Sequence, residues 1–193
     1  LKIVREAHEA GALVLVDESY IEFVDEPASV VDLVDSYSNL LVLRSITKPF
    51  GMPGLRIGYA VASEEVVELM SKVKTPWSVS VLAQVAAVEA LRDRRYLERV
   101  RALVARERRY VFEGLRRLGG LRAFPSKANF LLVDVEGAGR TSTALKAELL
   151  KHGILVRDCS SFKGLGENYI RIAVRRRFEN EALLKALTAV LGE

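Results

Sequence analysis

The chain has 193 residues, with 29 Lys and Arg against 25 Asp and Glu, a formal charge of +4, and 50% hydrophobic residues. This balance excludes a disordered chain, a collagen-like sequence and a disulfide scaffold, and the single cysteine, Cys159, cannot form an internal disulfide. The charge is too small to indicate a nucleic-acid-binding protein and no apolar run reaches the roughly 18 residues of a membrane span, so we expect neither partner.

The first part of the chain predicts an open α/β sheet. Residues 2–10 have the pattern of an amphipathic helix that ends at Gly11, and the apolar run 12–16 is typical of a parallel strand covered on both faces. Further strands are predicted at 39–43 and 57–62. The alternation of helix, strand, connection and strand is that of an α/β fold.

The rest of the chain predicts long helices and then a smaller mixed unit. A helix begins at Ser63, with an apolar face made of Val66, Leu69, Met70 and Val73. Long helices are expected at 79–91 and 96–118, and Gly119-Gly120 ends this stretch. Strands are then predicted at 121–124, 129–134, 154–157 and 169–174, with helices at 143–152 and 178–191. The predicted parts are a large α/β domain at 1–78, connecting helices at 79–118 and a small α+β domain at 119–193.

Polar side chains follow the first two predicted strands, at the edge where ligands bind in open parallel sheets. Asp17 and Tyr20 follow the first strand, and Ser45, Thr47 and Lys48 follow the second. Position alone favours the interpretation that these ends are polar because loops are hydrated. The spacing of the residues changes that judgement.

The segment from Ser45 through Lys48-Pro-Phe-Gly-Met-Pro-Gly-Leu to Arg56 closely resembles the lysine segment of the class I/II aminotransferases, which are pyridoxal-phosphate (PLP) enzymes of fold type I. That family has a serine three residues before the lysine and an arginine eight residues after it, as here. Asp17-Glu-Ser-Tyr20, about thirty residues upstream, is similar to the family's D-x-x-Y element. The resemblance implies the C-terminal part of a PLP fold type I large domain, a mostly parallel sheet with helices, followed by a small α+β C-terminal domain.

The resemblance also implies a role for each matching residue. Lys48 would hold PLP as a Schiff base and then act as the general acid/base. Asp17 would keep the pyridine nitrogen protonated, and Tyr20 would hydrogen-bond the phenolic oxygen of the ring. Ser45 and Arg56 would bind the phosphate, with Arg56 as a bidentate partner. No metal site is predicted.

Two later segments, Gly153-Ile-Leu-Val-Arg157-Asp-Cys159 and Tyr169-Ile-Arg171, resemble the C-terminal domain of histidinol-phosphate aminotransferases and threonine-phosphate decarboxylases. In this branch of the family Arg171 would bind the substrate carboxylate or an equivalent anionic group, and Arg157 would contact the substrate phosphate. Asn129 stands where the family places a strand beside the active site, as a candidate lining residue. The alternative for both arginines is an exposed arginine in a salt bridge.

The resemblance leaves three possible functions for the protein. Pro76-Trp77 and the long connection from Arg157 to Arg171, with Arg175 after it, favour a threonine-phosphate decarboxylase of the cobalamin pathway. The alternative is a histidinol-phosphate aminotransferase of histidine biosynthesis, and the second alternative is a non-catalytic PLP-binding effector domain of a regulator. Either enzyme would act on a small phosphorylated amino compound. The resemblance implies a cytoplasmic protein that is a homodimer at full length.

The chain begins with Leu1 inside a predicted helix, and the resemblance covers about the C-terminal half of the family's usual length. We therefore expect a fragment that lacks the family's N-terminal arm, the residues that stack on the pyridine ring and several strands. Such a fragment is expected to expose core and sheet edge, to bind PLP poorly and to be prone to aggregate.

Overall fold

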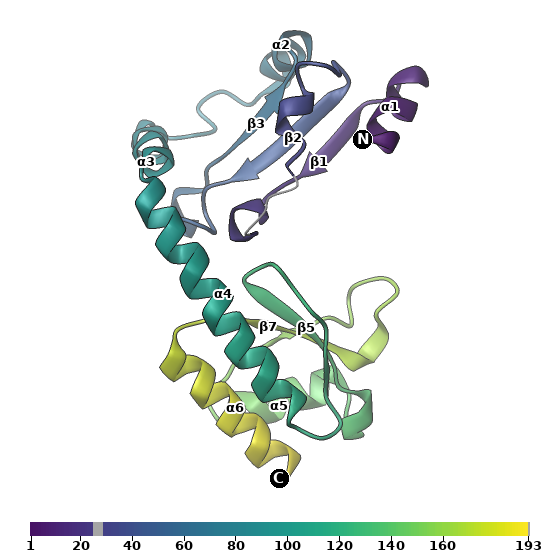
Figure 1. The fold of residues 1–193 in the computed structure, drawn as a ribbon, viewed down its shortest axis with the longest axis vertical. Coiled ribbons are helices and arrows are strands. Elements are labelled where there is room, and N and C mark those ends of the chain that lie inside the picture. Colours follow the sequence, from purple (N-terminus) through teal and green to yellow (C-terminus); the bar gives the residue numbers. More distant parts are fainter. Residues whose placement is uncertain (25–28, 193) are drawn as a thin grey trace. The chain divides into compact units, whose positions relative to one another are not determined.

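Two sheets organise the chain in the computed structural model, which describes residues 1–24 and 29–192. The chain divides into two units, Leu1–Arg101 and Ala102–Glu193, each with its own sheet (Figure 1). The boundary between the units falls inside helix α4 (Arg94–Arg116). The predicted parts 1–78, 79–118 and 119–193 are a different division and stay a prediction.

The sheet of the first unit has the strand order β1 (Val14–Asp17), β2 (Leu40–Ser45) and β3 (Gly58–Ala62). β1 and β2 are parallel, whereas β2 and β3 are antiparallel with Ser45 opposite Gly58. All three strands lie where the apolar runs predict them. The parallel pair places the ends of β1 and β2 at one edge, and the antiparallel return brings the start of β3 to that same edge.

One face of this sheet is covered by helix α1 (Lys2–Glu9) and by the segment 30–37. Their common core is made of the buried side chains Val4, Val34, Leu40 and Val42. Leu15 is 57% exposed, so the prediction that β1 is covered on both faces is wrong. Because side chains alternate along a strand, Leu15 points away from the face that Val14 and Val16 share with α1.

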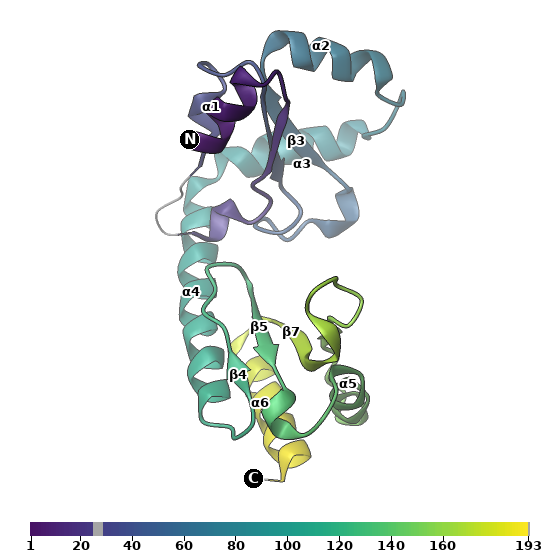
Figure 2. The ribbon, with the colours of Figure 1, turned by 90° about the vertical axis from the view of Figure 1, so that its right-hand side faces the viewer.

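The two other helices of the first unit are α2 (Glu64–Val73) and α3 (Val81–Arg92), shown from a second side in Figure 2. α2 begins after Ser63 as predicted, but its apolar stripe is not buried: Leu69 and Val73 are 55% and 84% exposed. The expectation that the chain exposes apolar core is thereby confirmed. Among the described residues, no helix is both long and apolar enough to cross a bilayer.

The second unit holds an antiparallel sheet of order β4 (Arg122–Ala123), β5 (Phe130–Asp134), β7 (Tyr169–Ala173) and β6 (Arg157–Asp158). The edge strand β6 is shorter than the prediction of 154–157 and lies later in the chain, and Leu155, before it, is 72% exposed. The strand prediction at 154–157 is therefore correct only at its last residue.

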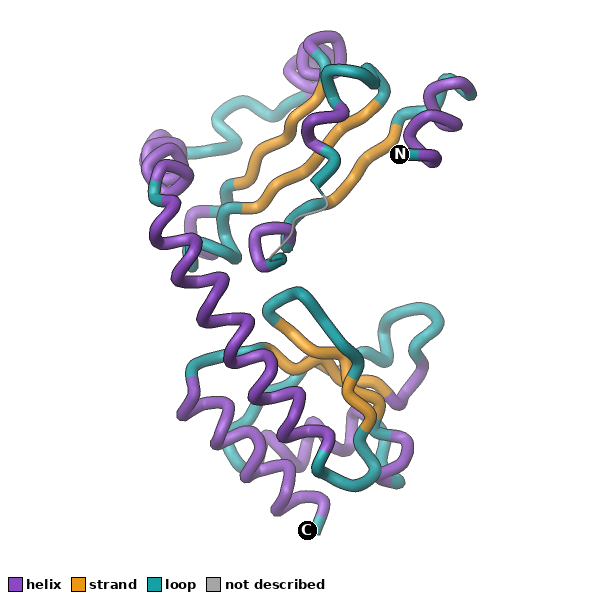
Figure 3. Tube along the Cα trace, in the orientation of Figure 1, coloured by secondary structure: helices purple, strands orange, loops and turns teal. Residues whose placement is uncertain are grey.

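Three helices cover one face of this second sheet. They are the later part of α4, α5 (Ser142–Lys151) and α6 (Arg177–Leu191), and α4 and α6 run side by side (Figures 1 and 3). Their core takes one alternating set of strand side chains, which are Leu131, Val133, Ile170 and Ile172. The opposite alternation leaves Arg171 on the open face.

Candidate functional site

A cavity of about 580 Å³ lies at the edge where β1 and β2 end. Its lining includes Ser45 at the end of β2, Thr47 and Lys48 after it, Arg56 before β3, and Ser19 after β1. The structure thus brings three of the five predicted cofactor residues into one lining. The cause is the β2–β3 pairing, which sets the end of β2 against the residues that follow Arg56.

The backbone around the cavity is unusual at two positions. Arg56 is in the left-handed region, at φ +50°, and its Nη1 donates to the Pro53 carbonyl at 3.2 Å. Such a conformation costs energy in a residue other than glycine and persists where the surroundings require it. A Cβ at Gly58 would lie 2.7 Å from the Arg44 carbonyl oxygen, so glycine permits the close approach of β3 to β2 beside the cavity.

Asp17, Tyr20 and Lys48 lie together at this edge. The Lys48 Nζ is 4.6 Å from the centroid of the Tyr20 ring. Hydrogen bonds from the Ser19 side chain and backbone hold the pKa of the Asp17 carboxyl below its usual value, and the charge of Lys48 acts in the same direction. The backbone N–H of Ser19 donates to Asp17 Oδ1 at 2.9 Å. Asp17 is therefore a carboxylate at neutral pH, and it can serve as the partner of a cationic ring nitrogen.

Polar groups in this unit also suit a phosphate. Ser45 Oγ and Thr47 Oγ1 are 2.9 Å apart, so one hydroxyl hydrogen remains directed elsewhere. The cationic side chains of Lys48 and Arg56 line the same cavity. Hydroxyl and guanidinium donors around one hollow are the donor set that a phosphate dianion takes in proteins.

The sequence motifs assign no role to Arg44, which also lines this cavity. Its side chain is only 14% exposed and is paired with Glu18 and Glu22, each at 2.8 Å. The sequence does contain an indication that Arg44 is paired, because this charged residue directly follows the apolar residues of β2. A charge in that position needs a buried partner, and the neighbour of Asp17 is that partner.

In the second unit, Arg157 and Arg171 lie opposite each other on β6 and β7. Together with Lys146 they contribute three cationic side chains to the lining of a cavity of about 330 Å³. The Arg157 guanidinium carbon is 5.6 Å from the Phe162 ring centroid, and that of Arg171 is 5.0 Å from the Phe130 ring centroid. Like charges directly opposite one another are unfavourable in a sheet, so this cavity suits an anion.

Two other residues singled out in the sequence lie near these arginines along the chain. Asn129 directly precedes β5 and its carbonyl accepts from the Val174 N–H at 2.9 Å, but it is not brought into the lining of this cavity. Cys159 is buried, and burial raises the pKa of its thiol. The thiol form therefore prevails at neutral pH, and the side chain packs rather than reacts.

The sequence matches a known protein family over nearly its whole length. A family model described as aminotransferase class I and II matches residues 1–189. Over 190 residues the chain is 38% identical to the histidinol-phosphate aminotransferase of Methanocaldococcus jannaschii. The matched region is 97% of this chain and 50% of that relative. The chain thus spans about half the length of the curated relative it matches.

Solved structures give a consistent result. The histidinol-phosphate aminotransferase from Clostridium acetobutylicum superposes with a TM-score of 0.93 at 32% identity, over 99% of this chain and 57% of that one. The L-threonine-O-3-phosphate decarboxylase from Porphyromonas gingivalis superposes with a TM-score of 0.87 at 29% identity, over 100% of this chain and 58% of that one. Both kinds of enzyme share the fold described above.

Proposed function

The chain belongs to the aminotransferase class I and II family, whose members depend on PLP, and from this premise we propose that it supplies the cofactor lysine and the substrate-binding arginines of such an enzyme. The observation that carries the proposal is that Ser45, Lys48 and Arg56 line one cavity. An ordinary surface lysine is not expected to line one cavity with a serine three residues before it and an arginine eight residues after it, which is the spacing of the family.

The residues around the cavity fit PLP. Lys48 would hold it through Nζ, and Ser45 and Arg56 would bind its phosphate. The Asp17 carboxylate would hold a proton on the pyridine nitrogen, and the Tyr20 hydroxyl would hydrogen-bond the ring oxygen. When bound, PLP supplies an acceptor for the electrons left at the substrate Cα. Lys48 Nζ would then carry the proton to or from that carbon.

For the substrate we propose a small phosphorylated amino compound. Arg171 and Arg157 lie opposite each other beside one cavity, and their guanidinium groups would bind its anionic groups. Asn129 stays a predicted lining residue. A homodimer and a cytoplasmic location likewise stay predictions from the resemblance.

Two reactions are candidates, and the relatives support both. Transamination of histidinol phosphate is favoured by the 38% identity to an enzyme of that name and by the TM-score of 0.93 to another. Decarboxylation of threonine phosphate, which the connection from Arg157 to Arg171 favours, is supported by the decarboxylase structure at 29% identity. The preference for decarboxylation drawn from the sequence is not singled out by these comparisons.

The cofactor assignment is tested by trapping. The protein at its natural length is incubated with PLP, reduced with borohydride and digested, and the pyridoxyl group is located by mass spectrometry. We expect the label on Lys48 in preference to the exposed Lys72 and Lys127, which serve as internal controls. Lys48→Ala should remove the preferred label and leave the background on the other two. A label shared evenly among all lysines would show that Lys48 is an ordinary surface amine.

The reaction is tested on the protein at its natural length. Histidinol phosphate with 2-oxoglutarate should yield glutamate if the enzyme is a transaminase. Carbon dioxide released from threonine phosphate without glutamate would select the decarboxylase. A protein that is labelled at Lys48 but gives neither product would support the effector-domain hypothesis instead.

A further inference from the structure

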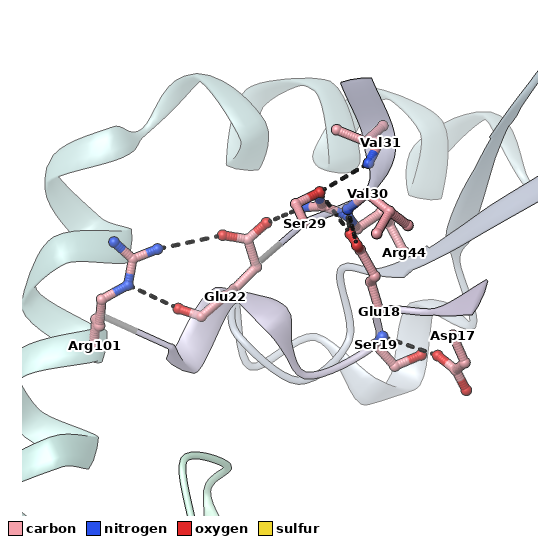
Figure 4. Close-up of polar contacts among 9 residues, drawn as sticks. All are labelled: Asp17, Glu18, Ser19, Glu22, Ser29, Val30, Val31, Arg44 and Arg101. Carbon is pink, nitrogen blue, oxygen red and sulfur yellow. Dashed lines mark hydrogen bonds and ion pairs between the residues drawn. The ribbon is translucent and has the colours of Figure 1, made fainter. Parts of the chain in front are cut away.

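A buried ion pair lies behind the cavity of the first unit, between the turn after β1 and the end of β2 (Figure 4). The Arg44 Nε is 2.8 Å from Glu18 Oε2, Nη1 is 2.8 Å from Glu22 Oε1, and Nη2 donates to Ser29 Oγ at 2.8 Å. Nη1 and Nη2 therefore donate hydrogen bonds to Glu22 and Ser29, whereas Nε is in ion-pair contact with Glu18 but makes no hydrogen bond to a described residue.

The carboxylate of Glu18 is satisfied from a second direction. Its Oε1 accepts from the Val30 N–H at 2.7 Å, and its Oε2 accepts from the Ser29 hydroxyl at 3.0 Å. Glu18 is only 6% exposed. A buried carboxylate is stable when it is paired and hydrogen-bonded in this way. Glu18 and Arg44 therefore belong to one polar network that joins the turn, the end of β2 and residues 29–30.

Each member of the pair stands next to a proposed cofactor residue. Glu18 directly follows Asp17, and its backbone N–H donates to the Leu43 carbonyl at 2.9 Å, which extends the β1–β2 pairing. Arg44 directly precedes Ser45. Because these residues are adjacent in the chain, a shift of Glu18 would move the backbone of Asp17, and a shift of Arg44 would move the backbone of Ser45.

The turn is also fastened from helix α4. Arg101 Nε donates to the Glu22 carbonyl at 3.0 Å, and its Nη2 is 3.6 Å from Glu22 Oε2. Glu22 thus lies between two arginines, one on β2 and one on α4 (Figure 4). Between Glu18 and Glu22 stands Tyr20, whose ring lies 4.6 Å from Lys48 Nζ.

We propose that Arg44 and Glu18 are positioning residues, which hold the turn at residues 17–23 against the end of β2 and so fix Asp17 and Tyr20 relative to Lys48. Arg44 lines the cavity, but its guanidinium is occupied by Glu18, Glu22 and Ser29, so it acts through the turn. The effect on the cofactor rests on the proposed function, whereas the fastening of the turn does not.

The shape of the arginine side chain makes the proposal testable. A planar guanidinium reaches three partners at once, whereas a lysine is a single point charge. Arg44→Lys therefore keeps the charge beside Glu18 and loses the fork. The matched control is Arg177→Lys in the second unit, where Arg177 Nε and Nη2 bind the buried Glu107 at 2.9 and 3.1 Å. It makes the same chemical change at a buried carboxylate outside the cavity.

Two measurements are made on each variant of the protein at its natural length, after circular dichroism has shown that it folds. Amide hydrogen exchange without PLP should rise about tenfold at residues 18–24 in Arg44→Lys, and not in Arg177→Lys. Borohydride trapping should give about tenfold less label on Lys48 in Arg44→Lys, with a shifted visible absorption maximum for the PLP that still binds. Glu18→Gln should change both measurements in the same direction, and Arg177→Lys should match the wild type in the trapping.

The outcomes separate the two proposals. If the wild type does not label Lys48, the proposed function is overturned, while faster exchange in Arg44→Lys still supports the fastening of the turn. If exchange is unchanged in Arg44→Lys, the inference is overturned whatever PLP does. If exchange rises but the label and the absorption maximum equal those of the wild type, the pair is structural only, and the positioning role is overturned.

Discussion

Each unit of the molecule contains a buried glutamate paired with an arginine, but the surroundings of the two pairs differ. In the second unit Glu107, 1% exposed, binds Arg177 between helices α4 and α6, which already share a closed apolar core. In the first unit Glu18 binds Arg44 beside a cavity, where the shared core is small and Leu15 is 57% exposed. The same chemical pair therefore adds to a packed interface in one unit, and holds a turn with little apolar support in the other.

Removing the arginine of the second pair should have the largest effect on stability. Arg177→Ala leaves the buried Glu107 without its bidentate partner, which should lower the free energy of unfolding of this unit clearly more than the loss of an exposed ion pair does. Urea unfolding, with hydrogen exchange of the β5 and β7 amides to assign the transition, measures it. Lys151→Ala, which removes an exposed ion pair of the same unit, is the control and should cost at most about 0.5 kcal/mol. Equal effects of the two variants would contradict the comparison.

Truncation of a core side chain in the same unit should have the second largest effect on the free energy of unfolding. Leu131 on β5 is fully buried among the three helices, so Leu131→Ala should cost about 3 kcal/mol through lost transfer energy and the cavity that remains. The same unfolding experiment applies. Leu155→Ala, at a position 72% exposed, is the control in the same unit and should cost little. A small effect at Leu131 would show that the core of this unit is not closed.

Local patterns predicted most of the elements and the lining of the candidate site. The apolar runs that became β1, β2 and β3 are continuous, and the spacing of Ser45, Lys48 and Arg56 singled out three residues that line one cavity. What periodicity does not report is what lies against an apolar face. The stripe on α2 has the period of a buried face, yet Val73 is 84% exposed. The pattern predicted the helix and its apolar face, and that face is exposed, in line with the expectation that the chain exposes apolar core.

The residues that no motif identified are those whose partners are distant in the chain. Arg177 and Glu107 are 70 residues apart, and Arg44 and Glu22 are 22 apart. Nothing in the spacing of one such residue points to the other. A charge next to an apolar run, as at Arg44, indicates that a buried partner exists, but only the fold says which carboxylate it is.

The Glu107–Arg177 pair should also make the free energy of unfolding of the second unit depend on pH below neutrality. Hydrogen bonds from Arg177 lower the pKa of Glu107 to about 2 from 4.5. Because the folded-state pKa is depressed, this stabilisation is complete above pH 4.5 and is lost as the pH falls toward 2. Glu107→Gln should therefore cost about 2 kcal/mol at neutral pH and less as the pH falls through this range. Unfolding midpoints of the two proteins, measured from pH 7 to pH 3, should converge on the acid side, and parallel profiles would contradict the assignment.

The smallest effect is expected at the exposed face of the first sheet. Leu15 points away from the core that β1 shares with α1, so Leu15→Ala should change the free energy of unfolding of the first unit by less than about 0.5 kcal/mol. Val42→Ala on the neighbouring strand β2, at a position that is fully buried, is the matched comparison and should cost several times more. Leu15→Ala should nevertheless reduce aggregation of the chain in light scattering, because an exposed leucine on an edge strand favours association. If Leu15→Ala instead destabilises as much as Val42→Ala, that face of β1 is covered in solution, and the contrast between the two units is smaller than the structure indicates.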